Sequence, residues 1–302
     1  MTFNLQQLHA FTTIVESGSL GRAAELLHVT QPSLSRTIKR LEEQLGAPLF
    51  ERHSKGMQLT AIGEALLPHA TLLQREADTA REEIDAMRGL AKGTIRVGAV
   101  ASIATLVLPL AVSRVLTRWP NLRVEIIEGV WDRLADSLLK REIDLALSMA
   151  VPDTDEITAI ADCCWEDTSY VVAAFDHPLR GKADLCLADT LDQRWCLPPR
   201  GTGPVEHMER VFTEHGLGMP EVAVETRSIT VLKSLVTRAG FLSWLAAPMY
   251  DTEREAHVFD ALPIAGLVGR RTLTAFRRRE GILPGPAVKL LEQLRQLAAA
   301  QR

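Results

Sequence analysis

Apolar residues recur at intervals of three and four over the first 60 positions, which is the spacing of one face of an α-helix. They predict three short helices, over 5–17, 20–27 and 31–45. Gly18 ends the first helix and Gly46, in the stretch 46–48, ends the third, while Ser19 can cap the start of the second and Thr30 that of the third. The third helix has the clearest pattern, and its buried face is formed by Leu34, Ile38, Leu41 and Leu45.

A different pattern follows the third helix. Residues 49–59 alternate around a Lys55-Gly56 turn, which predicts a small β-hairpin, or wing. From Thr60 to about Gly89, apolar residues repeat at spacings of four and three, with Pro68 expected to kink the helix or delay its start. The repeat consists of Leu66, Ala70, Leu73, Ala77, Ala80, Ile84 and Met87. A heptad seam of this length favours a dimer contact over packing on its own domain.

Strands and helices alternate after a hinge at 89–93. This order predicts an α/β region with a parallel sheet and right-handed crossovers. Within it, 169–175 reads as a strand that enters a second lobe, and a late strand and a closing helix return to the first. The predicted fold class is therefore an all-α N-terminal part followed by a two-lobed, Rossmann-like α/β domain. The predicted divisions are 1–60, 61–90 and 91–302, with lobe I at about 91–163 and 268–302 and lobe II at about 164–267.

Composition narrows the class of protein. The 302 residues carry a formal net charge of −4, so binding to nucleic acid requires a local basic patch. No signal-peptide pattern and no uncharged apolar run of 18 residues occur, which indicates a cytoplasmic protein without a membrane span. The four cysteines form no C-x-x-C pair and have no histidine at metal-ligand spacing, so we expect reduced thiols, no metal and no cofactor.

The third helix carries polar and basic residues opposite its buried face. Gln31 and Ser33 can hydrogen-bond base edges or phosphates, and Arg36 can bind guanine or phosphate with two parallel bonds. Lys39 and Arg40 can neutralise backbone charge. The first 60 residues hold six basic and five acidic side chains, but the basic ones gather at this end and Glu42, Glu43 and Glu51 are expected elsewhere. An ordinary solvated helix face is the alternative.

Three motifs carry a family resemblance: AAELLHVTQPSLSRTIKRLE, LGAPLFER and LTAIG. They resemble the winged helix-turn-helix of the LysR-type bacterial transcriptional regulators, continuously over this domain and in architecture alone over 93–302. The resemblance implies a type 2 periplasmic-binding-protein-like effector domain. Its implied partners are promoter DNA, a small co-inducer between the lobes and further copies of the chain as a dimer of dimers, with RNA polymerase a candidate. By motif position the DNA contacts are Thr30, Gln31, Pro32, Ser33, Ser35, Arg36 and Lys39, supported on the wing by Arg52 and Lys55.

Ligands of open α/β sheets bind beyond the carboxyl ends of the strands. This rule selects the effector-binding candidates Ser102, Ile103, Trp131, Ser148, Arg200, Gly201, Thr202, Thr226 and Arg227. The two arginines and a helix start at Ser102 favour an anionic group, and Trp131 would stack on an apolar or ring portion. Alternatively, Trp131 only covers a helix end, the arginines pair with Glu206 or Glu225, and the effector is a neutral, sugar-like molecule.

Three other functions fit the sequence less well. An enzyme is not expected, because G-x-S-x-G, H-E-x-x-H and P-loop motifs are absent and 201–206 lacks the last glycine of G-x-G-x-x-G. The N-terminal helix-turn-helix argues against a free solute-binding protein. A thiol redox sensor on the same scaffold would use Cys186 and Cys196, but Cys196 falls inside a predicted strand, where a reactive thiolate is disfavoured.

Overall fold

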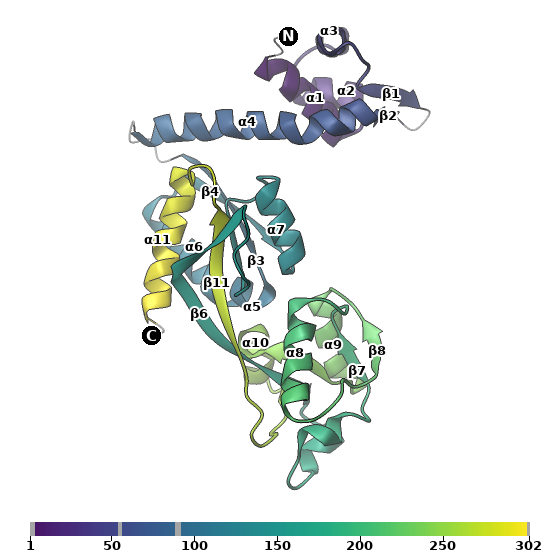
Figure 1. The fold of residues 1–302 in the computed structure, drawn as a ribbon, viewed down its shortest axis with the longest axis vertical. Coiled ribbons are helices and arrows are strands. Elements are labelled where there is room, and N and C mark those ends of the chain that lie inside the picture. Colours follow the sequence, from purple (N-terminus) through teal and green to yellow (C-terminus); the bar gives the residue numbers. More distant parts are fainter. Residues whose placement is uncertain (1–3, 54–55, 88–91, 301–302) are drawn as a thin grey trace. The chain divides into compact units, whose positions relative to one another are not determined.

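The computed structural model describes residues 4–53, 56–87 and 92–300. The chain divides into two compact units, Met1–Leu90 and Ala91–Arg302 (Figure 1). The first unit consists of α1 (Leu5–Ser17), α2 (Leu20–Leu26), α3 (Gln31–Leu45), β1 (Phe50–His53), β2 (Gly56–Leu59) and α4 (Ala61–Met87). Strands β1 and β2 pair antiparallel, so the predicted wing is present.

Helix ends in the first unit are mostly capped as the sequence predicts. Gly18 and Gly46 end α1 and α3 in the left-handed conformation, which glycine adopts at no steric cost. The Thr30 hydroxyl accepts a hydrogen bond from the Ser33 N–H at the start of α3. Ser19 lies at the N-cap position of α2, as predicted, but its side chain forms no cap hydrogen bond there.

The hydrophobic core of the first unit joins its helices to the wing. Phe11, Ile38, Leu41 and Leu49 are buried in one cluster with Ala70 of α4. A Cβ at Gly63 would collide with the Leu49 carbonyl oxygen, so only glycine lets the start of α4 approach the base of the wing this closely.

The predicted delayed start of the long helix is wrong, because α4 begins at Ala61 and continues through Pro68 (Figure 1). Thr60 caps it by accepting a hydrogen bond from the Gly63 N–H. Leu66 and Leu67, before Pro68, and Ala70, after it, all pack against the same core. This packing offsets the hydrogen bond that proline cannot donate.

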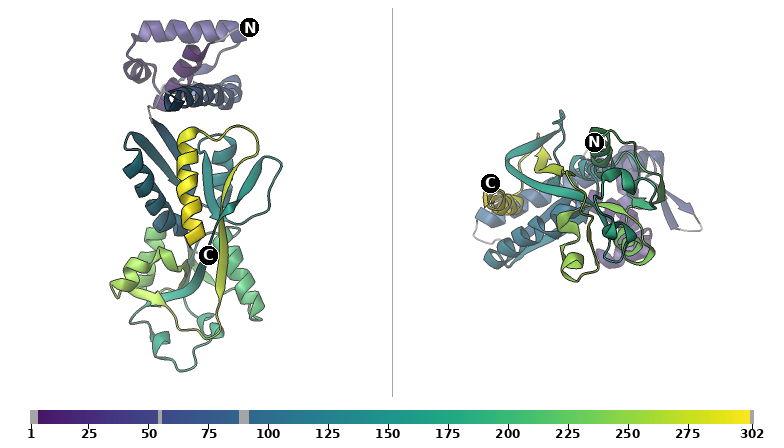
Figure 2. Two further views of the ribbon diagram at one scale, coloured as in Figure 1. Left: turned by 90° about the vertical axis from the view of Figure 1, so that its left-hand side faces the viewer. Right: turned by 90° about the horizontal axis from the view of Figure 1, so that it is seen from below.

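The second unit contains two lobes (Figures 1 and 2). Its elements up to the long strand β6 are β3 (Gly93–Ala99), α5 (Ala101–Thr105), α6 (Val107–Arg118), β4 (Leu122–Glu128), α7 (Trp131–Leu139), β5 (Leu145–Met149) and β6 (Ile157–Ala174). The later ones are β7 (Trp195–Leu197), α8 (Gly203–Glu214), β8 (Val222–Glu225), α9 (Ile229–Ala239), β9 (Ser243–Ala246), α10 (Asp251–Glu255), β10 (Phe259–Ala261), β11 (Gly269–Arg278) and α11 (Gly285–Ala300).

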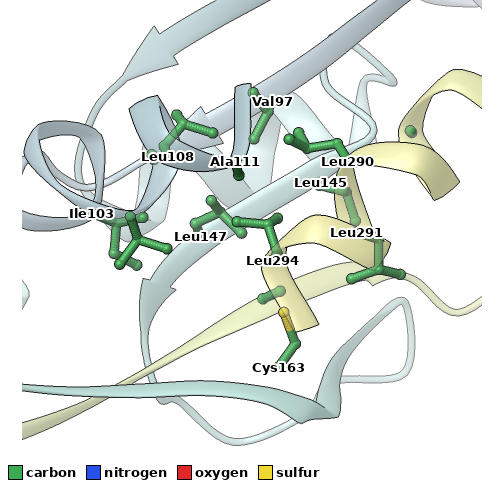
Figure 3. Close-up of a cluster of buried hydrophobic side chains, with 14 of the residues drawn as sticks. Val97, Ile103, Leu108, Ala111, Leu145, Leu147, Cys163, Leu290, Leu291 and Leu294 are labelled. Carbon is green, nitrogen blue, oxygen red and sulfur yellow. The ribbon is translucent and has the colours of Figure 1, made fainter. Parts of the chain in front are cut away.

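The sheet of lobe I is parallel only over part of its width. Strands β4, β3 and β5 are parallel as predicted, whereas β11 runs antiparallel to both of its neighbours, β5 and β6. Leu145 and Leu147 point into a core formed with α6 and α11 (Figure 3). Ala146 lies in a separate cluster on the opposite face, with Leu134 and Leu138 of α7. The alternation arises because successive strand residues face opposite sides of a sheet.

Two long strands belong to both lobes. Trp165 of β6 and Leu273 of β11 lie in the core of lobe I, whereas Val171 and the nearby Leu267 lie in a core of lobe II. Strand β6 begins at Ile157, earlier than the strand predicted at 169–175, because its first half completes the sheet of lobe I. The lobes therefore meet at the middle of β6 and the start of β11.

Candidate functional site

Helix α3 presents the predicted DNA-binding residues on the surface of the first unit. Thr30, Gln31, Pro32, Arg36 and Lys39 are exposed. Ser33 and Ser35 are half-buried, and Arg40 is exposed beside Lys39. Thr30, Gln31, Pro32 and Ser33 form the capped N-terminal end of α3, Arg36 lies more than one turn further along, and Lys39 and Arg40 lie about one turn beyond Arg36.

One feature of this surface differs from the sequence prediction. Glu43 was expected away from the basic residues, but its carboxylate lies 4.0 Å from Lys39 Nζ, one helical turn apart. Glu42 accepts a hydrogen bond from the Leu49 N–H and so joins α3 to the wing. Arg52 lies in β1, but its side chain and all of Lys55 lie outside the described residues.

A cavity of about 250 Å³ lies between the two lobes of the second unit. Lobe I contributes the residues that follow β3, β4 and β5, and lobe II those around the start of α8, the start of α9 and the end of β9. Apolar groups such as Val100, Met149, Ile229 and Leu245 form much of its wall. It therefore suits a small molecule with an apolar portion.

The structure brings some of the predicted effector residues to this cavity. Ser102, Trp131, Ser148 and Arg227 line it, and the cavity lies beyond the carboxyl ends of the parallel strands. Trp131 also packs its ring on Phe276, with centroids 4.5 Å apart. Trp131 therefore packs on β11 and also lines the cavity.

Five of the predicted residues are not among those that line the cavity: Ile103, Arg200, Gly201, Thr202 and Thr226. Ile103 is fully buried in the core of lobe I (Figure 3). Arg200 is exposed in the turn before α8. The hydroxyl of Thr202 donates to Pro199 O, and that of Thr226 accepts from the Ser228 N–H. Helix α5 has only five residues, so it gives Ser102 little of the dipole expected there.

The sequence reasoning missed Arg271, which lines the cavity from β11. Its Nε and Nη2 atoms donate to the two oxygens of Asp167 at 2.6 and 2.5 Å, and Nη2 also donates to Ser102 Oγ at 3.1 Å. Both side chains of this ion pair are almost fully buried. The sequence did indicate that Arg271 is buried, because it alternates along the strand in step with the apolar Leu273 and Ala275.

Exposed charges surround the rest of the cavity. Arg133, Arg210 and Arg227 line it together with Glu128 and Glu206. Glu206 and Arg210 are four residues apart on α8, a spacing at which opposite charges attract. Arg227 forms no ion pair with the described residues, including the Glu206 and Glu225 that the alternative reading proposed.

The cavity wall of lobe II is held by a buried histidine. Trp244, which lines the cavity, donates from Nε1 to His207 Nδ1, and His207 Nε2 lies 3.1 Å from the Arg270 carbonyl oxygen. Burial, with a smaller contribution from the charge of Arg271, lowers the pKa of His207 to about 4. His207 is therefore neutral at neutral pH and orients Trp244.

The cysteines lie apart from the cavity lining. Cys163 is buried in the core of lobe I (Figure 3), and burial raises its pKa to about 12. Burial likewise raises the pKa of Cys196 to about 11. Cys186 is exposed, so the two thiols of the redox alternative lie in different environments.

No group of three histidine, cysteine, aspartate or glutamate side chains in the described part of the chain is arranged to hold a metal ion. Among the described helices, none is long and apolar enough to cross a membrane.

Comparison with known proteins identifies relatives over the whole chain. Residues 88–299 match the model of the LysR substrate binding domain, and residues 5–64 match that of bacterial regulatory helix-turn-helix proteins, lysR family. The regulator GalR of Pseudomonas putida is 28% identical over 99% of this chain and 75% of its own. A RuBisCO operon transcriptional regulator of Acidithiobacillus ferrooxidans is 30% identical over 70% of this chain and 68% of its own. The crystal structure of full-length CbnR complexed with its target DNA has a TM-score of 0.72 and is 24% identical in sequence. The match covers 97% of this chain and 99% of that one.

Proposed function

This chain belongs to the LysR family of bacterial transcriptional regulators, and we propose that it controls transcription in response to a small organic acid bound between its lobes. The observation that carries the proposal is Arg227, which lines a largely apolar cavity and forms no ion pair with the described residues. A guanidinium without a carboxylate partner is a suitable binding group for the carboxylate of a ligand. Trp131 and the apolar wall would contact the remainder of the molecule.

Calorimetric titration of the full chain tests the acid. A carboxylic acid that binds should lose most of its affinity when it is replaced by its amide or alcohol. Arg227→Met should weaken the acid by roughly tenfold, the loss of one charge-assisted contact. Arg200→Met is the matched control, because Arg200 is exposed outside the cavity lining. Equal binding of acid and amide would reject the anionic effector and favour the neutral, sugar-like one.

We also propose that α3 reads promoter DNA in the major groove. Support comes from Gln31, Arg36 and Lys39, which are exposed along the first ten residues of α3. A related fold, that of CbnR, is known in complex with its target DNA. The wing residues Arg52 and Lys55 are proposed as supporting backbone contacts on sequence grounds alone.

The proposed dimer contact is the second half of α4. Leu66 and Ala70, at the start of the heptad seam, are used within the first unit. Leu73 is 43% exposed and Ile84 is 57% exposed, so large apolar groups of the same seam are left uncovered. A second copy of α4 would bury them, and two linked units would then read two half-sites, with a tetramer as the larger assembly.

A thiol redox switch has less support on this scaffold. The buried Cys163 and Cys196 have raised pKa values, and only the thiolate reacts readily with oxidants. Cys186 would therefore need a different partner thiol to form a disulfide.

A further inference from the structure

The pairing of Arg271 with Asp167 limits the chemistry of the ligand. We infer that the proposed acid carries an uncharged oxygen acceptor, such as a hydroxyl or a carbonyl, at the end remote from its carboxylate, and that Arg271 with Ser102 binds this oxygen. The inference rests on the proposed function, since it describes the other end of the same ligand.

Arg271, which lines the cavity, has N–H groups that lack a strong hydrogen-bond acceptor. A guanidinium has five N–H groups, and Asp167 and Ser102 accept from Nε and Nη2. For Nη1, the only acceptor among the described residues is the thioether sulfur of Met149 at 3.9 Å, a weak partner. Arg271 is only 8% exposed although it lines the cavity. A buried donor without a strong acceptor favours a ligand that supplies one.

A hydroxyl in contact with Arg271 lines the same cavity and can also donate. Ser102 Oγ accepts from Arg271, which leaves its own proton available. Ser148 also lines the cavity, but it lies opposite Thr274 in the register of β5 on β11, whereas Arg271 shares the face of Leu273 and Met149, so the Ser148 and Arg271 side chains leave the sheet on opposite faces. The Nη1 group of Arg271 and the Ser102 hydroxyl lie together at lobe I, where a ligand oxygen would accept.

Charge decides which kind of oxygen fits there. Asp167 already balances Arg271, so a carboxylate at this end would leave a net negative charge in a buried place. Burying an unbalanced charge costs several kcal/mol, whereas an uncharged acceptor leaves the balance unchanged. The exposed Arg227 of lobe II carries no such counter-charge among the described residues, so the carboxylate belongs on that side.

Matched sets of acids test this assignment on the full chain. Each set has one carboxylate and differs at the opposite end, for example 4-hydroxybenzoate, 4-methylbenzoate and terephthalate, with straight-chain sets of the same design. Melting temperatures select the sets that bind, and calorimetry measures them. The hydroxy or oxo member should bind at least tenfold more tightly than the methyl and dicarboxylate members.

Two variants connect the preference to the ion pair. Asp167→Asn keeps the size of the side chain and removes its charge, so it should reverse the preference toward the dicarboxylate. The dicarboxylate should also raise the melting temperature of this variant most, because it replaces the lost counter-charge. A double variant, Asp167→Asn with Arg271→Gln, should again prefer the uncharged end, and it provides a balanced control if the single variant is unstable.

The outcomes separate this inference from the proposed function. If acids bind and depend on Arg227, but the wild type prefers dicarboxylates or Asp167→Asn keeps the wild-type preference, this inference is wrong and the proposed function stands. If no acid binds, or amides bind equally well, the proposed function fails and this inference fails with it.

Discussion

Arg271 and Asp167 lie directly opposite each other on β11 and β6, where these antiparallel strands pass from one lobe to the other. Trp165, two residues before Asp167, lies in the core of lobe I, and Val171, four residues after it, lies in a core of lobe II. The ion pair is therefore at the junction of the lobes as well as at the cavity. A buried pair of this kind costs much to break, although it adds little net stability over apolar groups.

Removing one partner should accordingly destabilise the chain. Asp167→Ala leaves the Arg271 charge buried without a partner, and we expect the free energy of unfolding to fall by about 3–5 kcal/mol. The double change Asp167→Leu with Arg271→Met should recover most of this loss, since no unpaired charge is left. Denaturant unfolding measures both, and Asp136→Ala, which breaks an exposed pair with Lys140, is the control that should have a far smaller effect.

The pKa of His207 predicts a dependence of stability on pH. Burial lowers this pKa from 6.5 to about 4, so between these values the unfolded chain binds the proton that the folded chain excludes. The contribution to stability is complete above about pH 6.5 and is lost as the pH falls toward 4, by on the order of 3 kcal/mol. His207→Gln should flatten this part of the stability profile, and an unchanged slope would show that other groups cause it.

The cysteines should differ in reactivity in the folded chain. Iodoacetamide at neutral pH should modify the exposed Cys186 and leave Cys163 and Cys196 unmodified, because burial raises their pKa values to about 12 and about 11. Mass spectrometry of the labelled protein measures this. Promoter binding should survive mild peroxide; a disulfide between Cys186 and Cys196, with altered DNA binding, would instead support the redox alternative.

Charges on the α4 seam should separate the proposed dimer. Leu73→Glu with Ile84→Glu places repelling groups where two apolar faces would meet, so sedimentation should detect monomers. DNA binding should weaken strongly, because two half-sites need two linked units. Asp78→Asn with Arg81→Gln changes exposed residues outside the seam and should leave the dimer intact. Wild-type sedimentation of the glutamate variant would contradict the assignment.

Arg36 and Lys39 should make different contributions to DNA binding. Arg36→Ala should cost about 1–3 kcal/mol on the specific promoter and relax sequence preference, as expected for a base contact. Lys39→Ala should weaken specific and scrambled duplexes alike and reduce the dependence on salt concentration. Affinities at several salt concentrations measure this, with Arg81→Ala as the exposed control. The α3 assignment fails if neither variant differs from the wild type.

The sequence by itself determined the local elements and their order. Helices α1 to α3, the wing and the long α4 follow from apolar spacing and from capping residues such as Thr30, Gly18 and Gly46. The alternation of strands and helices indicated two α/β lobes, and the carboxyl ends of their strands pointed to Ser102, Trp131, Ser148 and Arg227. These features depend on neighbours within a few residues, which is the range that periodicity and capping describe.

The tertiary structure decided what depends on distant partners. Helix α4 continues through Pro68, because its packing on the rest of the first unit outweighs the lost hydrogen bond. The tertiary structure placed Arg200 in an exposed turn and Ile103 in a core, although both follow strands as a ligand site requires. Above all it joined Arg271 to Asp167, which lie 104 residues apart. Only the register of β11 on β6 makes that pair, and register is set by the packing of whole sheets.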